Sequence, residues 1–337
     1  MNRLARGMSF LVALSLLLTA CGRGSTAPPT PGSENTTVSP AEPKPEIKPA
    51  DPKPTEPEKP FTPAVAVSAG VESDLTELND EFGDPATLAN WVELAAVEGH
   101  QSWIETLDVN KSSEGHMYLV PYLSSWFQDF RGVFLFKEVT GDFDVVTRVM
   151  TTGKQTNVPT GFYSVGGVMA RKPRGITMDT WLPNRENWTF IVTGRGDDGA
   201  PAGPEGAQFE TKSTTDSRSN VSITPSKPGW MELRLIRIGP SFSLLYRYDG
   251  DTDWQISRRY TRTDMPQTLQ VGLNAYSRPQ LISSPKEHML DPDKKPGDAV
   301  IRFDYIRFQR PQVPDTLKDR ATKLTDAELL TILNGSH

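Results

Sequence analysis

Short segments rich in β-branched and aromatic residues, separated by Gly, Pro, Asp and Asn, follow one another from residue 102 to residue 309. In one of them Phe143, Val145 and Val149 alternate with polar neighbours, which is typical of a strand with one buried face. A series with hairpin spacing and no helix within it predicts a sandwich or a barrel. The expected strands are 102–109, 116–123, 131–139, 142–150, 162–171, 187–195, 208–215, 230–238, 241–248, 254–261, 269–277 and 299–309.

Two turns in this series can be read closely. One lies at Gly239-Pro240 and the next at Asp249-Gly250. Asp-Gly favours a tight hairpin because glycine adopts a positive φ without steric cost. The strand before the first turn loses its apolar alternation at Ile236, which predicts a β-bulge there.

The order of strands and turns resembles that of the concanavalin A-like lectin/glucanase superfamily, and more narrowly its secreted jelly-roll domains. The resemblance covers Asp80 to Arg310 and implies an all-β, concanavalin A-like jelly-roll β-sandwich, here expected over 76–311, with a short C-terminal helix. Ligands of such domains lie on the concave sheet or its rim loops. The segments that carry the resemblance are 80–91, 141–149, 165–172, 187–192, 229–254, 269–277 and 301–308.

Catalytic motifs are missing from the sequence. Retaining members of the superfamily use an E-x-D-x-E strand motif whose paired carboxyl groups act as nucleophile and acid/base, and the chain has none. Its closest pair, Asp142 and Asp144, is more simply a solvated strand start. Zinc-ligand spacings, a P-loop, a dinucleotide fingerprint and a G-x-S-x-G elbow are also missing. We expect no catalysis, with a hydrolase that uses other carboxylates as the alternative.

Two polar and aromatic stretches, 122–132 and 170–188, could bind a sugar, and Tyr276 ends a strand in a similar way. Aromatic faces suit the C–H groups of a sugar ring and planar polar side chains suit its hydroxyl groups. Trp126 and Trp181 lie in polar loops and are expected to be exposed; the alternative is that most of the aromatic residues belong to the core. The candidate ligand-binding residues are Trp126, Asp129, Arg131, Arg171, Trp181, Asn184, Arg185, Asn187 and Tyr276.

A weaker candidate is a calcium site in the segment YDGDTDW. It places Asp249, Asp251 and Asp253 close together, and loops rich in oxygen ligands can bind Ca²⁺. An exposed hairpin has the same composition, and the EF-hand pattern is not met. No other cofactor is expected.

The start of the chain has the features of an export signal. A positive start, an apolar stretch over Phe10–Leu18 and small residues after it predict a signal peptide over 1–20, because a membrane span needs roughly 20 apolar residues. Leu18-Thr19-Ala20-Cys21 resembles the lipobox of bacterial lipoproteins. The resemblance implies that Cys21, the only cysteine, carries acyl chains such as palmitate that anchor it stably. A chance cysteine after an ordinary signal peptide is the alternative.

Residues 21–75 are expected to form a disordered, proline-rich spacer behind the lipidated cysteine. Twelve of the 29 prolines lie between Pro28 and Pro63, and few apolar residues are present to offset the entropy of folding. Such a segment favours extended polyproline II and acts as a stalk, with a ligand for a PxxP-binding domain as the alternative. The resemblance to bacterial lipoproteins implies that Gly22, the residue after the cysteine, favours the outer membrane of the envelope, where the protein would face the periplasm or the cell surface.

The last segment, 312–337, is expected to be helical. Thr325 and Glu328 form a capping-box pattern, Gly335 stops the helix, and an apolar stripe is formed by Leu329, Ile332 and Leu333. The stripe either packs on the sandwich or docks a protein partner.

The net charge of −6 and the sequence pI near 5.4 argue against nucleic-acid binding. The sequence therefore predicts a lipid-anchored envelope protein that displays a non-catalytic, glycan-binding β-sandwich.

Overall fold

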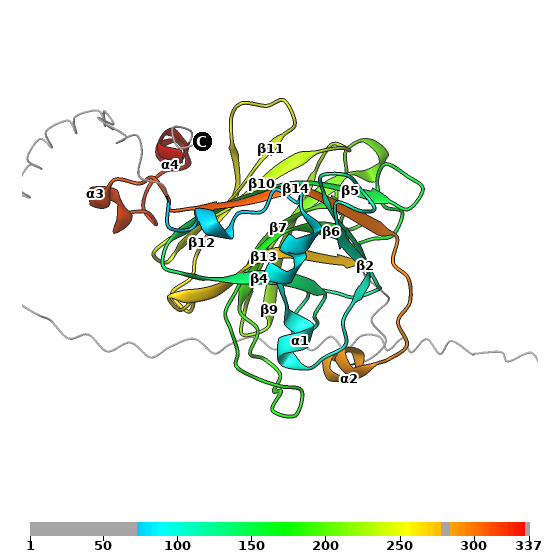
Figure 1. Cartoon of the computed structure of the whole chain (residues 1–337). Coiled ribbons are helices and arrows are strands. Elements are labelled where there is room, and N and C mark those ends of the chain that lie inside the picture. Colours follow the sequence, from blue (N-terminus) through cyan, green and yellow to red (C-terminus); the bar gives the residue numbers. More distant parts are fainter. Residues whose placement is uncertain (1–72, 278–283, 334–337) are drawn as a thin grey trace, which may run out of the picture. The chain divides into compact units, whose positions relative to one another are not determined.

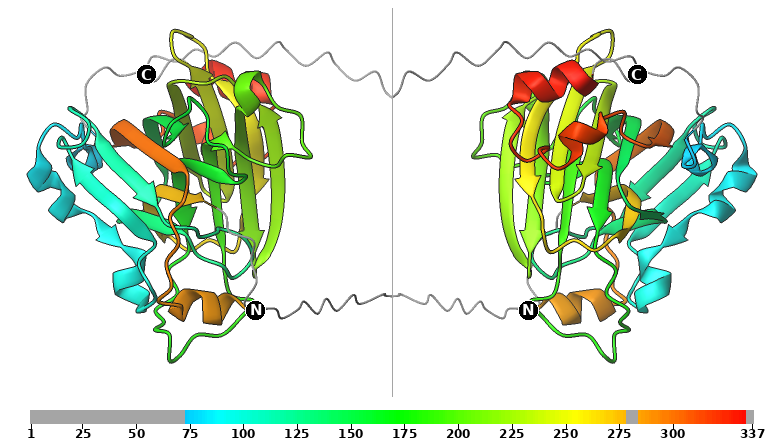
Figure 2. Two further views of the ribbon diagram at one scale, coloured as in Figure 1. Left: turned by 90° about the vertical axis from the view of Figure 1, so that its right-hand side faces the viewer. Right: turned by 90° about the vertical axis from the view of Figure 1, so that its left-hand side faces the viewer.

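Two seven-stranded sheets form the molecule over the residues that the computed structural model describes, 73–277 and 284–333 (Figure 1, Figure 2). Sheet 1 has the strand order β1 (Val92–Glu93), β4 (Val133–Thr140), β13 (Thr268–Ser277), β6 (Ser164–Arg171), β7 (Trp188–Arg195), β8 (Gln208–Thr215) and β9 (Arg218–Pro225). Sheet 2 has the order β12 (Gln255–Thr261), β11 (Ser241–Tyr248), β10 (Met231–Ile238), β5 (Phe143–Gly153), β14 (Ala299–Gln309), β3 (Met117–Pro121) and β2 (Ile104–Val109). The predicted all-β sandwich is confirmed. The expected signal peptide, Cys21 and nearly all of the spacer lie outside the described residues.

The core between the sheets is built from alternate residues of strands on both sides. Phe143, Val145 and Val149 of β5 pack there with Leu233 of β10 and Leu273 of β13, and all five are fully buried. Burying a side chain of this size contributes about 1.5 to 3 kcal/mol relative to leaving it in water. The predicted inward face of β5 is therefore confirmed, and its neighbours in both sheets share the same core.

The helical elements are short. They are η1 (Thr76–Leu78), η2 (Pro85–Asn90), α1 (Leu94–Glu98), η3 (Pro204–Gly206), α2 (Pro285–Leu290), α3 (Asp315–Lys318) and α4 (Asp326–Leu333). Because α2 lies between β13 and β14, the expectation of a series of strands without a helix is wrong. A capping box explains where α2 begins: Ser284 Oγ accepts from the Glu287 N–H and the Glu287 carboxylate accepts from the Ser284 N–H. In the described part of the chain, no helix is long and apolar enough to cross a membrane.

The bulge predicted at Ile236 is wrong. β10 pairs without a register shift with both β5 and β11. Ile236 is 1% exposed on the outer face of sheet 2, so apolar residues occupy both faces of the strand and break the alternation. Register shifts lie instead in other strands, at Ile104/Thr106, Leu244/Leu245 and Phe303/Tyr305.

The C-terminal helices lie against the strands of sheet 2 (Figure 2). The capping box at the start of α4 is present, since Thr325 Oγ1 accepts from the Glu328 N–H at 3.2 Å and the Thr325 N–H donates to the Glu328 carboxylate at 2.7 Å. The predicted stripe of Leu329, Ile332 and Leu333 is buried in one cluster with residues of sheet 2. This packing matches the first alternative for the tail; Gly335 lies outside the described residues.

The outer face of sheet 1 is covered as well. Trp188, Phe190 and Tyr276 form a third cluster there with Phe134 and with Trp126, which comes from the segment between β3 and β4. The Trp126 and Trp188 rings meet edge to face with centroids 5.8 Å apart. Both faces of both sheets are thus partly buried. Much of the exposed surface is therefore formed by the loops between strands.

Candidate functional site

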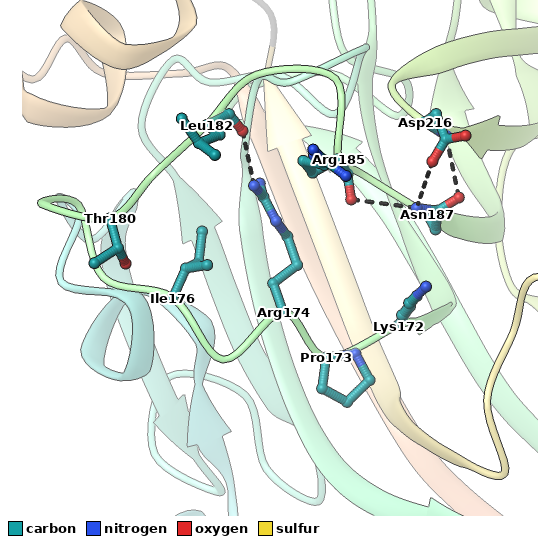
Figure 3. Close-up of a pocket in the computed structure, with 9 residues that line it drawn as sticks. All are labelled: Lys172, Pro173, Arg174, Ile176, Thr180, Leu182, Arg185, Asn187 and Asp216. Carbon is teal, nitrogen blue, oxygen red and sulfur yellow. Dashed lines mark hydrogen bonds between the residues drawn. The ribbon is translucent and has the colours of Figure 1, made fainter.

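The loop that joins β6 to β7, residues 172–187, folds back on itself. Its base is closed by the Lys172 N–H, which donates to the Asn187 carbonyl at 2.9 Å. Pro173 follows, and because proline cannot donate to a strand ladder the sheet ends here. Arg174 then crosses the loop and donates to the Leu182 carbonyl at 2.8 Å, as Figure 3 shows. One arginine therefore fixes the width of the loop.

A second contact ties this loop to the segment 122–132. The Asp129 carboxylate accepts the Asn184 N–H at 3.0 and 3.1 Å and also the Ser217 hydroxyl. Ser217 Oγ in turn accepts the Glu186 N–H at 3.0 Å. Both stretches predicted to bind a ligand thus meet, together with the turn between β8 and β9.

Beneath the loop lies a buried ionic cluster of five side chains: Glu98, Arg131, Arg171, Arg174 and Glu186. Glu186 accepts from Arg131 at 2.6 Å, from Arg174 at 2.7 Å and from Arg171 at 2.9 Å. Glu98, at the end of α1, accepts from Arg171 at 2.7 Å and from Arg131 at 2.9 Å. No side chain of the cluster is more than 6% exposed. The cluster joins α1, the 122–132 segment, the end of β6 and the folded loop.

The buried ionic cluster contains one more arginine than glutamate, so it carries a net positive charge when all five side chains are ionised. Burial by itself raises the pKa of the Glu186 carboxyl, but the charges of Arg131 and Arg171 outweigh burial and hold that pKa well below its ordinary value. Burial also lowers the pKa of His100, just beyond α1, to about 4, so this ring is neutral at pH 7. Three guanidinium groups therefore face two carboxylates.

A pocket of about 290 Å³ opens in the folded loop (Figure 3). On one side lie Ile176 and Thr180, and on the other Asn187 and Asp216. The Asn187 amide donates to the Asp216 carboxylate at 3.3 Å, and the Asp216 N–H donates back to the Asn187 amide oxygen at 3.0 Å. The lining residues are Lys172, Pro173, Arg174, Ile176, Thr180, Leu182, Arg185, Asn187 and Asp216.

Seven of the nine predicted candidates fall into three groups. Arg185 and Asn187 line the pocket. Four others hold the loop in place rather than lining the pocket: Asp129, Arg131, Arg171 and Asn184. Trp181, on the same loop, is half-buried.

The expectation that Trp126 is exposed is wrong. Its side chain is fully buried, and its indole Nε1–H donates to the Val133 carbonyl at 3.1 Å. Tyr276 is fully buried too, with its hydroxyl donating to Glu210 at 2.8 Å. The polar residues around Trp126 in the sequence suggested an exposed loop. The segment instead folds onto sheet 1 and packs Trp126 against Trp188.

Four polar lining residues were not among the candidates: Lys172, Arg174, Thr180 and Asp216. Three of them lie within the stretch 170–188, so their neighbours could have drawn attention to them. Asp216 had no such signal, because β9 was not predicted and the turn before it could not be recognised as a hairpin. β9 is half exposed and largely polar, which leaves little apolar alternation.

Three other carboxylates, Glu210, Asp144 and Asp142, have partners within the fold. Glu210 on the outer face of sheet 1 is buried and bound to Lys212 at 2.7 Å and to the Tyr276 hydroxyl. Asp144 is not solvated as expected: it is buried and bound to Arg234 at 2.6 Å, because the C-terminal helices cover this face. Asp142 accepts the Gly239 N–H at 2.7 Å.

The predicted calcium site is not formed. Asp249, Asp251 and Asp253 are all exposed on the turn, and Asp249 pairs with Arg148 at 3.0 Å. Across residues 73–277 and 284–333, no three His, Cys, Asp or Glu side chains come together in a way that could hold a metal ion.

Comparison with known proteins gives similarity in structure only. No protein-family model and no curated protein matches the chain. A functionally unknown protein from Saccharomyces cerevisiae is similar with a TM-score of 0.44 at 15% identity, covering 66% of this chain and 98% of that one. The GH43 protein BlXynB from Bacillus licheniformis gives 0.43 at 12%, covering 69% of this chain but only 39% of its own. Lectin I-B4 from Griffonia simplicifolia gives 0.40 at 10%, covering 68% and 98%. Because one fold hosts many functions, likeness of this degree assigns no ligand and no activity.

Proposed function

We propose that this chain is a lipid-anchored protein of a bacterial envelope whose concanavalin A-like β-sandwich binds a glycan without cleaving it. The observation that carries the binding proposal is the composition of the pocket in the β6–β7 loop. Arg185 supplies a planar polar group and Thr180 a hydroxyl group, whereas Ile176 and Leu182 supply apolar surface. A few placed polar groups on a partly apolar wall are typical of small-ligand sites, and they match the two kinds of surface on a sugar.

The carboxylates favour binding over hydrolysis. A glycosidase of the usual kind needs two carboxyl groups about 5 to 9.5 Å apart. Among the described residues that line the pocket, only Asp216 is acidic, and its carboxylate is already bonded to Asn187. Glu186 lies beneath the pocket but is neutralised by three arginines. These contacts support a site that holds a sugar and does not transfer protons to it.

We expect the purified full chain to bind at least one polysaccharide of a broad array and to release no reducing sugar from it. Ile176→Trp would fill part of the pocket of about 290 Å³ and should weaken binding at least tenfold, or about 1.4 kcal/mol. Leu290→Trp is the matched control, since Leu290 is 45% exposed on α2 and does not line the pocket. Affinity would be measured by calorimetry and sugar release by a reducing-end assay.

Each other outcome has a definite meaning. Sugar release would favour the hydrolase alternative. A chain that binds no polysaccharide, or one in which Ile176→Trp binds as well as Leu290→Trp, would contradict the proposal.

Lipid anchoring rests on the lipobox-like sequence before Cys21 and on the proline-rich spacer after it. In a bacterial host we expect the chain in the membrane fraction, labelled by a palmitate analogue. Cys21→Ser should abolish the label and release the protein, because no other cysteine can form the thioether. Label retained in Cys21→Ser would refute the assignment, and Ser25→Ala serves as a control for handling.

A further inference from the structure

The pocket contains two cationic side chains that the fold does not use. Lys172 and Arg185 both line it. Within residues 73–277 and 284–333, neither side chain has a hydrogen bond or an ion pair. We propose that these two residues bind the carboxylate of a uronic-acid residue, so that the ligand is an acidic polysaccharide. The inference rests on the glycan binding proposed above and adds the class of the glycan.

The carboxylates near the pocket do not neutralise the positive charge of Lys172 and Arg185. Glu186, the partner of Arg174, is shared with two further arginines, and Asp129 is occupied by Asn184 and Ser217. The cations of the pocket and its base are Lys172, Arg174, Arg185, Arg131 and Arg171. The carboxylates are Asp216, Asp129, Glu98 and Glu186. Asp264, which is bound to Arg262 at 2.7 Å, also acts on Lys172 electrostatically. With Arg262 and Asp264 included, six cations face five anions, in a chain whose net charge is −6. The excess is a local property of this site.

The chemistry of the two free cations suits a carboxylate. A guanidinium group such as that of Arg185 is planar and can donate two parallel hydrogen bonds to a carboxylate. Lys172 adds a point charge beside it, while Ile176 and Leu182 leave apolar wall for the ring. A volume of about 290 Å³ lies just below the range of about 300 to 1,000 Å³ for ligand pockets. It therefore suits one charged sugar residue of a chain rather than a long segment.

The test compares polysaccharides of the same backbone with and without the charged group. Polygalacturonate is paired with its methyl ester, and hyaluronan with carboxyl-reduced hyaluronan; dextran sulfate and dextran form a third pair. We expect the full chain to bind at least one uronate at least tenfold more tightly than its neutral partner. Raising the salt concentration should weaken binding of the uronate and leave the neutral form unchanged, because salt screens exposed charges.

Variants of the pocket locate the effect. Lys172→Met and Arg185→Met should each weaken uronate binding about tenfold, as expected for loss of a charge-assisted hydrogen bond. Their controls, Lys111→Met and Arg320→Met, change exposed cations that do not line the pocket. Asp216→Asn should tighten uronate binding about threefold by removing a like charge. Asp216 has φ 45°, a conformation that asparagine also adopts readily, so the turn should be retained.

The outcomes separate this inference from the proposed function. Equal binding of acidic and neutral partners would overturn the uronate and leave glycan binding intact. Binding of dextran sulfate as tightly as the uronates would overturn the carboxylate as the group recognised. If Lys172→Met and Arg185→Met bind like their controls, the site is elsewhere. Failure of every polysaccharide would remove both proposals together.

Discussion

Glu186→Gln is expected to lower the free energy of unfolding by about 3 to 5 kcal/mol, because removing one partner of a buried ion pair leaves an uncompensated charge. Glu186 is fully buried and accepts from three arginines. Without its charge, Arg131 and Arg171 share only Glu98, and Arg174 loses its ion pair. A loss of this size is a large part of the 5 to 15 kcal/mol typical of a folded domain. Urea denaturation of both proteins measures it.

The matched control for this experiment is Glu81→Gln. Glu81 also pairs with an arginine, Arg307, at 2.8 Å, but both side chains are more than half exposed. Exposed pairs contribute about 0 to 1 kcal/mol, so the control should lose little. Equal losses in Glu186→Gln and Glu81→Gln would show that the buried cluster does not stabilise the fold.

The pH dependence gives a second readout. Because the folded-state pKa of Glu186 is held below its ordinary value of 4.5, its contribution is complete above that pH and is lost as the pH falls towards the lowered pKa. The difference in stability between wild type and Glu186→Gln should therefore narrow below pH 4.5. A difference that does not change with pH would contradict the cited shift.

Removal of α4 is expected to have an effect of similar size. A chain that ends at Thr325 loses Leu329, Ile332 and Leu333, none of which is more than 6% exposed. At about 1.5 to 3 kcal/mol for each buried side chain, the loss is roughly 5 kcal/mol or more. The truncation also uncovers Arg234, which donates to the Leu333 carbonyl at 3.3 Å. Thermal unfolding of the truncated and full chains measures the loss.

Because the truncated chain could fail to fold, Leu329→Ala provides the quantitative test. It removes a side chain that is 1% exposed and should cost about 2 to 5 kcal/mol. Leu330→Ala is the same change at a partly buried neighbour and should cost clearly less. If Leu329→Ala leaves stability unchanged, α4 does not dock on sheet 2, and a protein partner for its apolar stripe becomes the better hypothesis.

Strands could be predicted from the sequence wherever one face is buried and the other polar. β11 was expected at 241–248 and is found at Ser241–Tyr248. β9 escaped prediction because it is half exposed and mostly polar, and Ile236 suggested a bulge because both faces of β10 are buried. The alternation of apolar and polar residues is therefore lost when a strand is buried on neither face or on both faces.

The candidate site could be predicted only as a stretch of sequence. The segment 170–188 was selected for its planar polar side chains, and Arg185 and Asn187 from it do line the pocket. Which other residues bury their side chains depends on long-range contacts. Arg131 and Arg171 lie far apart in the sequence and share Glu98 and Glu186, and Trp126 is buried because its segment folds onto sheet 1.

The amino-acid order alone was enough to predict a chain of short strands, a capped C-terminal helix and a proline-rich N-terminal region, because alternation, capping and composition act over a few neighbouring residues. The tertiary structure decided which polar residues are buried as ion pairs and which remain free to bind a ligand. Lys172 and Arg171 are adjacent in the sequence, yet Arg171 is fully buried among carboxylates and Lys172 lines the pocket. That difference arises because charge compensation in a fold depends on which distant carboxylates the packing of sheets and loops brings within hydrogen-bond reach.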